Sequence, residues 1–260
     1  MTGWDVLSEF PQLFTGRGLT EGMARRLIRE GVGSPRALLV IGAGSGAAIQ
    51  PFKDLSCRIV ALDRSRRMAV LCRATGISCV VAEATAIPVH RNAFDSVVIV
   101  TGVLDCLDDN QSEAVLRECH RITQPDSTLL ATHLDHTCDE EFYSQWRLTD
   151  GDRVFSRRKI ALWNEFESRP EAFADATRVA AMSNFFSALR AEARKKGLPL
   201  SVALESLPEF QVIRSPVQLS KLLKDTGWEI VGSWTYSASN AFYVQASRVQ
   251  SPNDNRESQK

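Results

Sequence analysis

The chain has 260 residues, 44% hydrophobic and 24% charged, so it can fold around a sizeable core. Lys and Arg together number 31, as do Asp and Glu, and the formal net charge is zero. Proteins that grip nucleic acid through its phosphates usually carry a basic excess, so this balance argues against a nucleic-acid partner.

The sequence also argues against secretion, membrane insertion and metal binding. No basic stretch at the amino terminus leads into an apolar run, and no apolar run approaches the roughly 20 residues of a membrane-spanning helix. The six cysteines form no Cys-x-x-Cys pair and mostly lie within apolar runs, a pattern that favours buried free thiols. We therefore expect a cytoplasmic protein with no membrane span and no metal site.

Short apolar runs alternate with amphipathic stretches in the first half of the chain. The runs cover residues 37–41, 59–62, 78–82, 96–100 and 128–132. Short runs that are β-branched and apolar on both faces are typical of strands buried in a parallel sheet. The alternation predicts right-handed crossovers and a Rossmann-like, doubly wound α/β domain.

The alternation stops after His133 and returns near Ser215. Between them we expect a short helix over residues 139–147 and a long one over 170–196 that ends at Gly197. After them, a helix over 216–226 and two strands over 228–234 and 241–246 would complete a mostly parallel, seven-stranded sheet. The helical insertion therefore follows the fifth strand.

This pattern divides the chain into five parts. They are an amino-terminal helical segment (1–34), a Rossmann-like core (35–134), a helical insertion (135–214), a final helix with two strands (215–247) and a disordered tail (248–260).

A glycine-rich segment, Gly42-Ala43-Gly44-Ser45-Gly46, follows the first predicted strand and precedes a helix. Glycines let the chain turn sharply and let a ligand approach the backbone closely. Asp63 ends the second predicted strand, 21 residues after Gly42. An acid at this place can accept hydrogen bonds from both hydroxyls of a ribose. Together they predict a nucleoside-containing cofactor, and the spacing suits both nicotinamide dinucleotides and S-adenosylmethionine.

Five segments resemble, in order and spacing, the motifs of class I S-adenosylmethionine methyltransferases. They are LVIGAGSG at 39–46, ALDRSRRM at 61–68, VAEATAIPV at 81–89, AFDSVV at 93–98 and LRECHRITQP at 116–125. The resemblance covers residues 24–134 well and residues 216–247 loosely. It implies S-adenosylmethionine as the cofactor and methyl transfer as the activity.

The resemblance also implies which residues bind the cofactor. The implied set is Gly42, Ala43, Gly44, Asp63, Arg64, Glu83, Ala84 and Thr101. Gly42 and Gly44 would face the methionine part and Asp63 would hold the ribose. Glu83 would lie beside the adenine, and Thr101 would lie near the sulfonium.

Two positions depart from the family pattern. Val40 stands where the family places an acid that helps to hold the amino group of the cofactor. Pro125-Asp126-Ser127 replaces a proline-glycine-glycine turn.

The acceptor side of the site is predicted to follow the fifth strand, where ligands gather in open α/β sheets. His133 is the first candidate for a general base, and its alternative role is to bond backbone groups at the strand end. Asp135 and His136 are further candidates, and Asp105 is weaker because capping of a helix suits it better. Amino-methylating enzymes that act on nucleic acid or glutamine commonly carry an Asn-Pro-Pro-aromatic tetrapeptide after the fourth strand. This chain has none there, which favours a small-molecule acceptor.

The predicted insertion is rich in aromatic residues, among them Tyr143 and Trp146. Aromatics at helical spacing commonly form a core. An inserted layer beside the strand ends would also form a lid with a substrate pocket, so we expect it to cover an apolar or aromatic acceptor.

Other functions remain open at this point. Residues 42–47 also fit the loop of a nicotinamide-dependent oxidoreductase, although the chain lacks the Tyr-x-x-x-Lys pair of short-chain dehydrogenases. A non-catalytic binding protein with this fold is a second alternative, supported by Val40. Methylation of RNA or protein is a third, because zero net charge does not forbid it.

Overall fold

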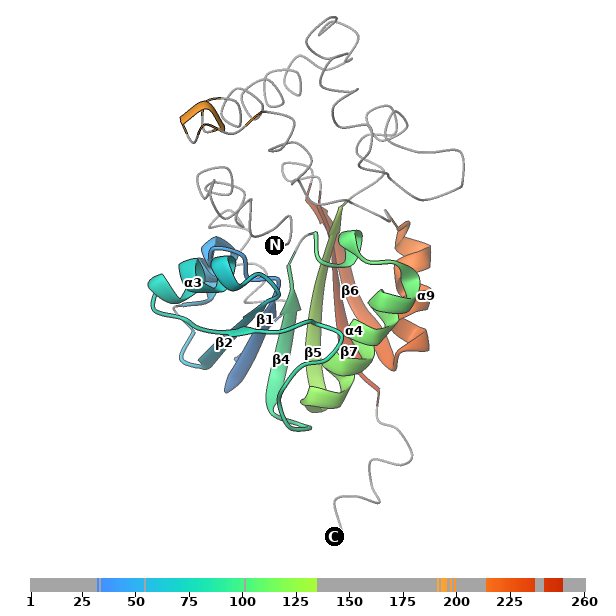
Figure 1. The fold of residues 1–260 in the computed structure, drawn as a ribbon. Coiled ribbons are helices and arrows are strands. Elements are labelled where there is room, and N and C mark those ends of the chain that lie inside the picture. The colour runs from blue at the N-terminus through green and yellow to red at the C-terminus, as the bar shows by residue number, and fades with distance from the viewer. Residues whose placement is uncertain are drawn as a thin grey trace, which may run out of the picture.

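A computed structural model of the chain describes residues 32, 34–53, 55–100, 102–134, 191, 193–195, 197, 199, 214–236 and 241–249. Most of them form one seven-stranded sheet with helices on both faces (Figure 1). Nearly all of the predicted amino-terminal helical segment, nearly all of the predicted insertion and residues 250–260 lie outside the described residues.

The strands form a mostly parallel sheet in the order β3-β2-β1-β4-β5-β7-β6. Their bounds are β1 Ala37–Ile41, β2 Arg58–Asp63, β3 Ser78–Val81, β4 Phe94–Ile99, β5 Thr123–Leu134, β6 Trp228–Tyr236 and β7 Ala241–Arg248. The first five strands run parallel, and β7 pairs antiparallel with both β5 and β6. The predicted doubly wound sheet of seven strands is thus confirmed.

Helices α3, α4 and α9 begin where the sequence supplies side-chain caps. The bounds of the helices are η3 Ala47–Phe52, α3 Arg66–Ala74, η4 Leu104–Cys106, α4 Asp109–Ile122 and α9 Pro216–Asp225, of which η3 and η4 are 3₁₀ helices. Asp108 with Gln111 and Ser215 with Gln218 form capping boxes that satisfy the free N–H groups at the starts of α4 and α9. The helix predicted after the glycine segment is the short 3₁₀ helix η3.

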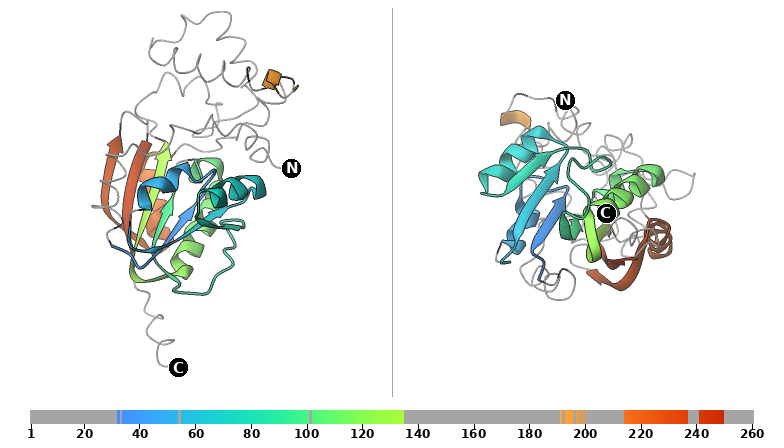
Figure 2. Two further views of the ribbon diagram at one scale, coloured as in Figure 1. Left: turned by 90° about the vertical axis from the view of Figure 1, so that its left-hand side faces the viewer. Right: turned by 90° about the horizontal axis from the view of Figure 1, so that it is seen from below.

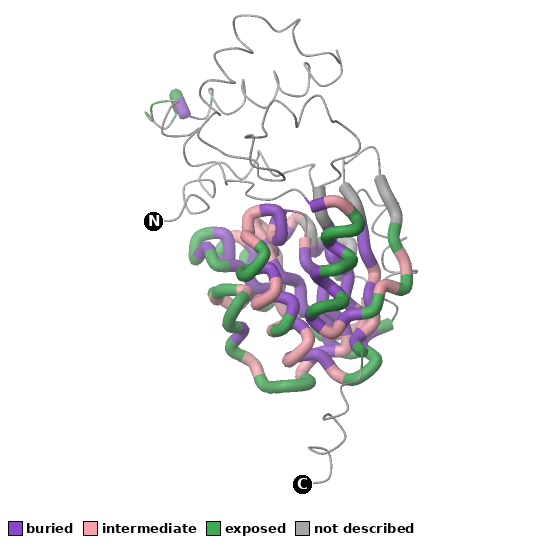
Figure 3. Tube along the Cα trace, turned by 90° about the vertical axis from the view of Figure 1, so that its right-hand side faces the viewer, coloured by how far each residue is buried: buried purple, intermediate pink, exposed green. Residues whose placement is uncertain are grey.

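Helices lie on both faces of the sheet, and the tube coloured by burial shows the buried stretches of the chain in this region (Figures 2 and 3). Two apolar clusters form the core. One packs β-strand side chains such as Leu39 and Ile41 against α4 and α9, and the other packs Leu38 and Val40 against η3 and α3. All five residues of β1 are buried, as expected for a central parallel strand. Val40 is fully buried in the second cluster, so the position of the missing family acid belongs to the core.

The third strand departs from its prediction. β3 lies at the edge of the sheet, and its Ser78 and Val81 are exposed, so it is not buried on both faces. An edge strand has one neighbouring strand and less cover, which its apolar composition did not reveal.

Two buried arginines extend the core past the predicted boundaries. Arg248, assigned to the disordered tail, instead ends β7 and donates to Asn92 Oδ1 (3.0 Å) and to the carbonyl of Thr123. Arg214, assigned to the insertion, is 4% exposed and binds Asp109 Oδ1 (2.7 Å). The prediction for Arg248 was wrong because its guanidinium finds partners that are remote in sequence. The insertion that was predicted to end at Arg214 stays a prediction.

The described residues 191 and 193–195 are helical, and Gly197 has a φ of +66°, in agreement with the predicted helix end there. Within the described part of the chain, no helix combines the length and the apolar character needed to cross a membrane.

Candidate cofactor-binding site

The glycine segment forms a tight loop over the carboxyl end of β2. The N–H groups of Gly42 and Ala43 both donate to the carbonyl oxygen of Leu62, at 2.8 and 3.1 Å. Gly42 and Gly44 have φ angles of +75° and +55°, which side chains rarely allow. The loop after β1 is therefore fixed to the neighbouring strand.

The two glycines serve different purposes. A Cβ atom on Gly42 would lie 2.1 Å from Cγ2 of Val103, so the backbone of β1 packs directly against the segment that follows β4. A Cβ atom on Gly44 would meet no atom of the described residues within 4 Å. The loop thus has one closely packed glycine and one whose backbone is open to a ligand.

Asp63 joins this loop to the start of α3. Its Oδ2 accepts the N–H of Gly44 (2.8 Å), and its Oδ1 accepts the N–H of Ser65 (2.9 Å). Ser65 in turn caps α3 by accepting the N–H of Met68 (3.2 Å). A carboxylate has about four acceptor positions, so one such group can bind several donors at once. The structure therefore brings the predicted loop and the predicted acid into direct contact.

Arg64 and Glu83 meet at the same edge of the sheet. They follow β2 and β3, whose register is fixed by the pairing of Asp63 with Val81 and by a bond from Ala82 N to Asp63 O (3.2 Å). Arg64 Nε lies 3.5 Å from Glu83 Oε1, and both side chains are about half exposed. Ala84, next along the chain, is half-buried and packs against the core.

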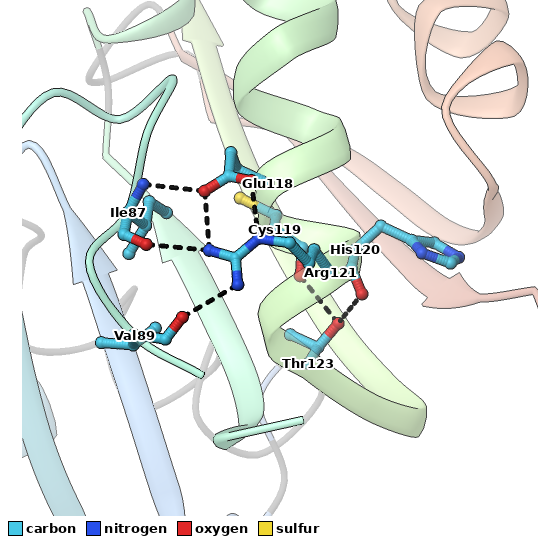
Figure 4. A network of polar contacts seen from close by, with 7 residues as sticks. All are labelled: Ile87, Val89, Glu118, Cys119, His120, Arg121 and Thr123. Atoms are coloured by element: carbon cyan, nitrogen blue, oxygen red, sulfur yellow. Dashed lines mark hydrogen bonds and ion pairs between the residues drawn. The ribbon is translucent and has the colours of Figure 1, made fainter. Parts of the chain in front are cut away.

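A polar network on α4 fixes the loop after β3 (Figure 4). Arg121 donates to the carbonyls of Ile87 and Val89 (2.8 Å each), and Glu118 accepts the N–H of Ile87 (2.8 Å). Glu118 and Arg121 also form an ion pair at 2.7 Å. The hydrogen bond from Arg121 lowers the pKa of Glu118, and the same bond raises the pKa of Arg121. This network was not predicted, although Glu and Arg three residues apart on a helix could have indicated the pair.

The segment after β4 is partly described. Thr101 lies outside the described residues, and Gly102 donates its N–H to Asp105 Oδ2 (3.0 Å). Asp105 is fully buried. A local structural bond therefore accounts for Asp105 better than a role as a base.

The acceptor side remains a prediction. The backbone of His133 pairs with Phe242 across β5 and β7, and its side chain is outside the described residues. Asp135, His136, Tyr143 and Trp146 also lie outside them.

Comparison with known proteins agrees with this geometry. Residues 39–131 match a family described as "Methyltransferase domain". A demethylmenaquinone methyltransferase of Renibacterium salmoninarum is 29% identical over 153 residues, which cover 57% of this chain and 61% of the relative. The crystal structure of a SAM-dependent methyltransferase from Methanosarcina mazei superposes with a TM-score of 0.58 at 15% identity, over 86% of this chain and 98% of the other.

Residues 39–131 thus match a methyltransferase domain, and the fold is that of class I methyltransferases. A second relative, a demethylmenaquinone methyltransferase of Paenarthrobacter aurescens, is 24% identical over 85% of this chain and 72% of the relative. The chain spans less than two thirds of the length of the Renibacterium relative.

The match to a methyltransferase domain supports S-adenosylmethionine as the cofactor. The described residues fit it, because the glycine loop lies beside a carboxylate, the group that accepts hydrogen bonds from ribose hydroxyls. The nicotinamide alternative loses its support, since the family match covers the glycine loop, the acid and the three motifs after them.

Proposed function

We propose that this protein transfers a methyl group from S-adenosylmethionine to a small-molecule acceptor. The observation that carries the proposal is the contact of Gly44 N with Asp63 Oδ2 at the carboxyl edge of the sheet. We assign the cofactor to Gly42, Ala43, Gly44, Asp63, Arg64, Glu83, Ala84 and Thr101.

These residues would bind and orient the cofactor. The carboxylate of Asp63 would accept hydrogen bonds from the ribose hydroxyls, and the open backbone at Gly44 would lie along the methionine part. Glu83 would accept a hydrogen bond from the adenine amine. When bound, S-adenosylmethionine supplies a methyl group already activated by its sulfonium.

The rest of the protein would place the acceptor in line with that methyl group and exclude water. We propose His133 as the base that takes a proton from the acceptor where its nucleophilic atom carries one. We also propose that residues 135–214 form a lid over the acceptor, with Tyr143 and Trp146 in its pocket.

A finer proposal concerns the acceptor. Both relatives are named demethylmenaquinone methyltransferases, so a reduced quinone ring is the first acceptor to test. The aromatic residues of the proposed lid suit a flat apolar ring.

The test is to incubate the purified protein with labelled S-adenosylmethionine and either demethylmenaquinol or a fractionated small-molecule extract. The expected result is labelled methyl in a small-molecule product, with no product from an Asp63→Ala variant. Binding of S-adenosylhomocysteine without transfer to any fraction would support a non-catalytic binding protein instead. Labelled product formed by methylation of demethylmenaquinol would support the finer proposal. Labelled product from another compound alone would refute it.

A further inference from the structure

The ion pair of Arg64 and Glu83 spans the carboxyl ends of β2 and β3. Its two atoms, Arg64 Nε and Glu83 Oε1, lie 3.5 Å apart. Because Asp63 immediately precedes Arg64, the pair lies next to the carboxylate to which we assign the ribose. The base attached to that ribose would therefore extend toward this pair.

Stability of the fold does not explain the pair. The side chains are 47% and 59% exposed, and exposed ion pairs add little to the free energy of unfolding. Arg64 also precedes the amino terminus of α3, whose first turn has no acidic residue. A cation at that end of a helix is unfavourable, because the helix dipole is positive there.

The pair does have one consequence for ligand binding. Arg64 engages Oε1 of Glu83, which restrains a long side chain that would otherwise be free to rotate at the surface. The other carboxylate oxygen can then accept a hydrogen bond from a donor on the ligand. An amino group on a purine is such a donor, whereas a carbonyl at the same place would be repelled by the carboxylate.

We propose that Arg64 is a positioning residue, which orients Glu83 so that the site selects a 6-aminopurine over a 6-oxopurine. This inference rests on the proposed assignment of the cofactor to this edge of the sheet. It refines that assignment for Arg64, which would act through Glu83 in place of direct contact with the cofactor.

The test compares two ligands that differ only at the purine 6-position, S-adenosylhomocysteine and S-inosylhomocysteine, by titration calorimetry. We expect the wild-type protein to prefer the adenine form by about tenfold or more. Arg64→Gln should weaken binding of the adenine form roughly fivefold and leave the inosine form unchanged, and Arg64→Lys should restore part of the loss. Arg66→Gln, an exposed arginine two residues later, is the matched control and should behave as wild type.

A double variant separates positioning from direct contact. If Arg64 acts through Glu83, Arg64→Gln adds no further loss in a Glu83→Gln background. Equal loss for both ligands, or additive losses in the double variant, would overturn the inference while leaving the cofactor site in place. If neither ligand binds the wild-type protein, the proposed function fails as well.

Discussion

Gly44 donates its backbone N–H to Asp63 Oδ2 over 2.8 Å, so the acid that we assign to the ribose also fixes the glycine loop. The second oxygen of Asp63 accepts the N–H of Ser65 at the start of α3. One carboxylate thus joins β2, the loop after β1 and helix α3. Ligand binding and loop geometry are expected to depend on it together.

Replacing Asp63 with Ala should abolish cofactor binding. The variant loses the proposed bonds to the ribose and the support of the loop, and bonds to a charged group contribute about 1.5–3 kcal/mol each. We expect the Kd for S-adenosylhomocysteine to rise at least about 100-fold. Calorimetry measures this loss, with Ser65→Ala as the control.

Ser65→Ala removes the cap of α3 and keeps the backbone N–H that Asp63 accepts, so it should cost about 1 kcal/mol in urea unfolding and leave affinity near that of wild type. Tight binding by Asp63→Ala would contradict the assignment of the ribose to this carboxylate.

Replacing Gly42 with alanine should lower the free energy of unfolding more than replacing Gly44. Gly44→Ala meets open space and should cost about 1 kcal/mol, from backbone strain alone. Gly42→Ala combines similar strain with an overlap against Val103 Cγ2, and should cost about 3 kcal/mol. Urea unfolding of the two variants gives the comparison.

A Val103→Ala background tests the cause of the larger loss. Removing the Val103 methyl groups should recover about 1 kcal/mol of the Gly42→Ala effect, because the two positions are in contact. Equal losses for the two glycine variants would show that packing at Gly42 is unimportant.

Much of the cofactor edge could be predicted from the sequence, because its signals are local. The apolar run of β1, the glycines after it and Asp63 at the end of β2 occur at fixed spacing, and that spacing placed them together. The start of α9 could be predicted equally well, since Ser215 and Pro216 are strong signals for a helix start.

The features that could not be predicted depend on contacts between distant parts of the chain. Arg64 meets Glu83 only because β2 and β3 are neighbours in this register. Arg214 and Arg248 are polar residues in segments with weak patterning, and their burial follows from partners that lie more than 100 residues away. No local pattern reports such pairings, so the burial of these two arginines could not be predicted from the sequence.

The lowered pKa of Glu118 predicts a stability that depends on pH. A folded-state pKa below the ordinary value of about 4.3 means that the unfolded chain binds more protons between the two values. The contribution of Glu118 is therefore present above about pH 4.3 and is lost as the pH falls through the folded-state pKa. We expect Glu118→Gln to cost about 1–2 kcal/mol at neutral pH and progressively less in acid.

Urea unfolding across this pH range measures the difference between the two proteins. Glu113→Gln is the matched control on the same helix, because Glu113 forms an exposed pair with Arg117 and should cost under about 0.5 kcal/mol at any pH. A difference in free energy of unfolding between wild type and Glu118→Gln that stayed constant down to acidic pH would contradict the dependence of stability on the protonation of Glu118.

Replacing Arg214 should lower the free energy of unfolding far more than replacing its ion-pair partner, Asp109. Its guanidinium is buried and donates to the carbonyls of Leu104 and Leu107 as well as to Asp109, so Arg214→Met leaves two carbonyls without this donor. We expect a loss of about 3 kcal/mol in urea unfolding. Asp109→Asn should cost about 1 kcal/mol or less, because the Asp109 side chain is 75% exposed.

The two variants should also differ in cofactor affinity. The carbonyl of Leu104 belongs to η4, and the neighbouring Val103 packs against Gly42 of the glycine loop. Loosening η4 in Arg214→Met is therefore expected to weaken binding of S-adenosylhomocysteine several-fold, whereas Asp109→Asn should bind as wild type does. Calorimetry at a temperature where both variants are folded separates the two effects. Equal affinity in both variants would mean that η4 stabilises the fold without supporting the loop.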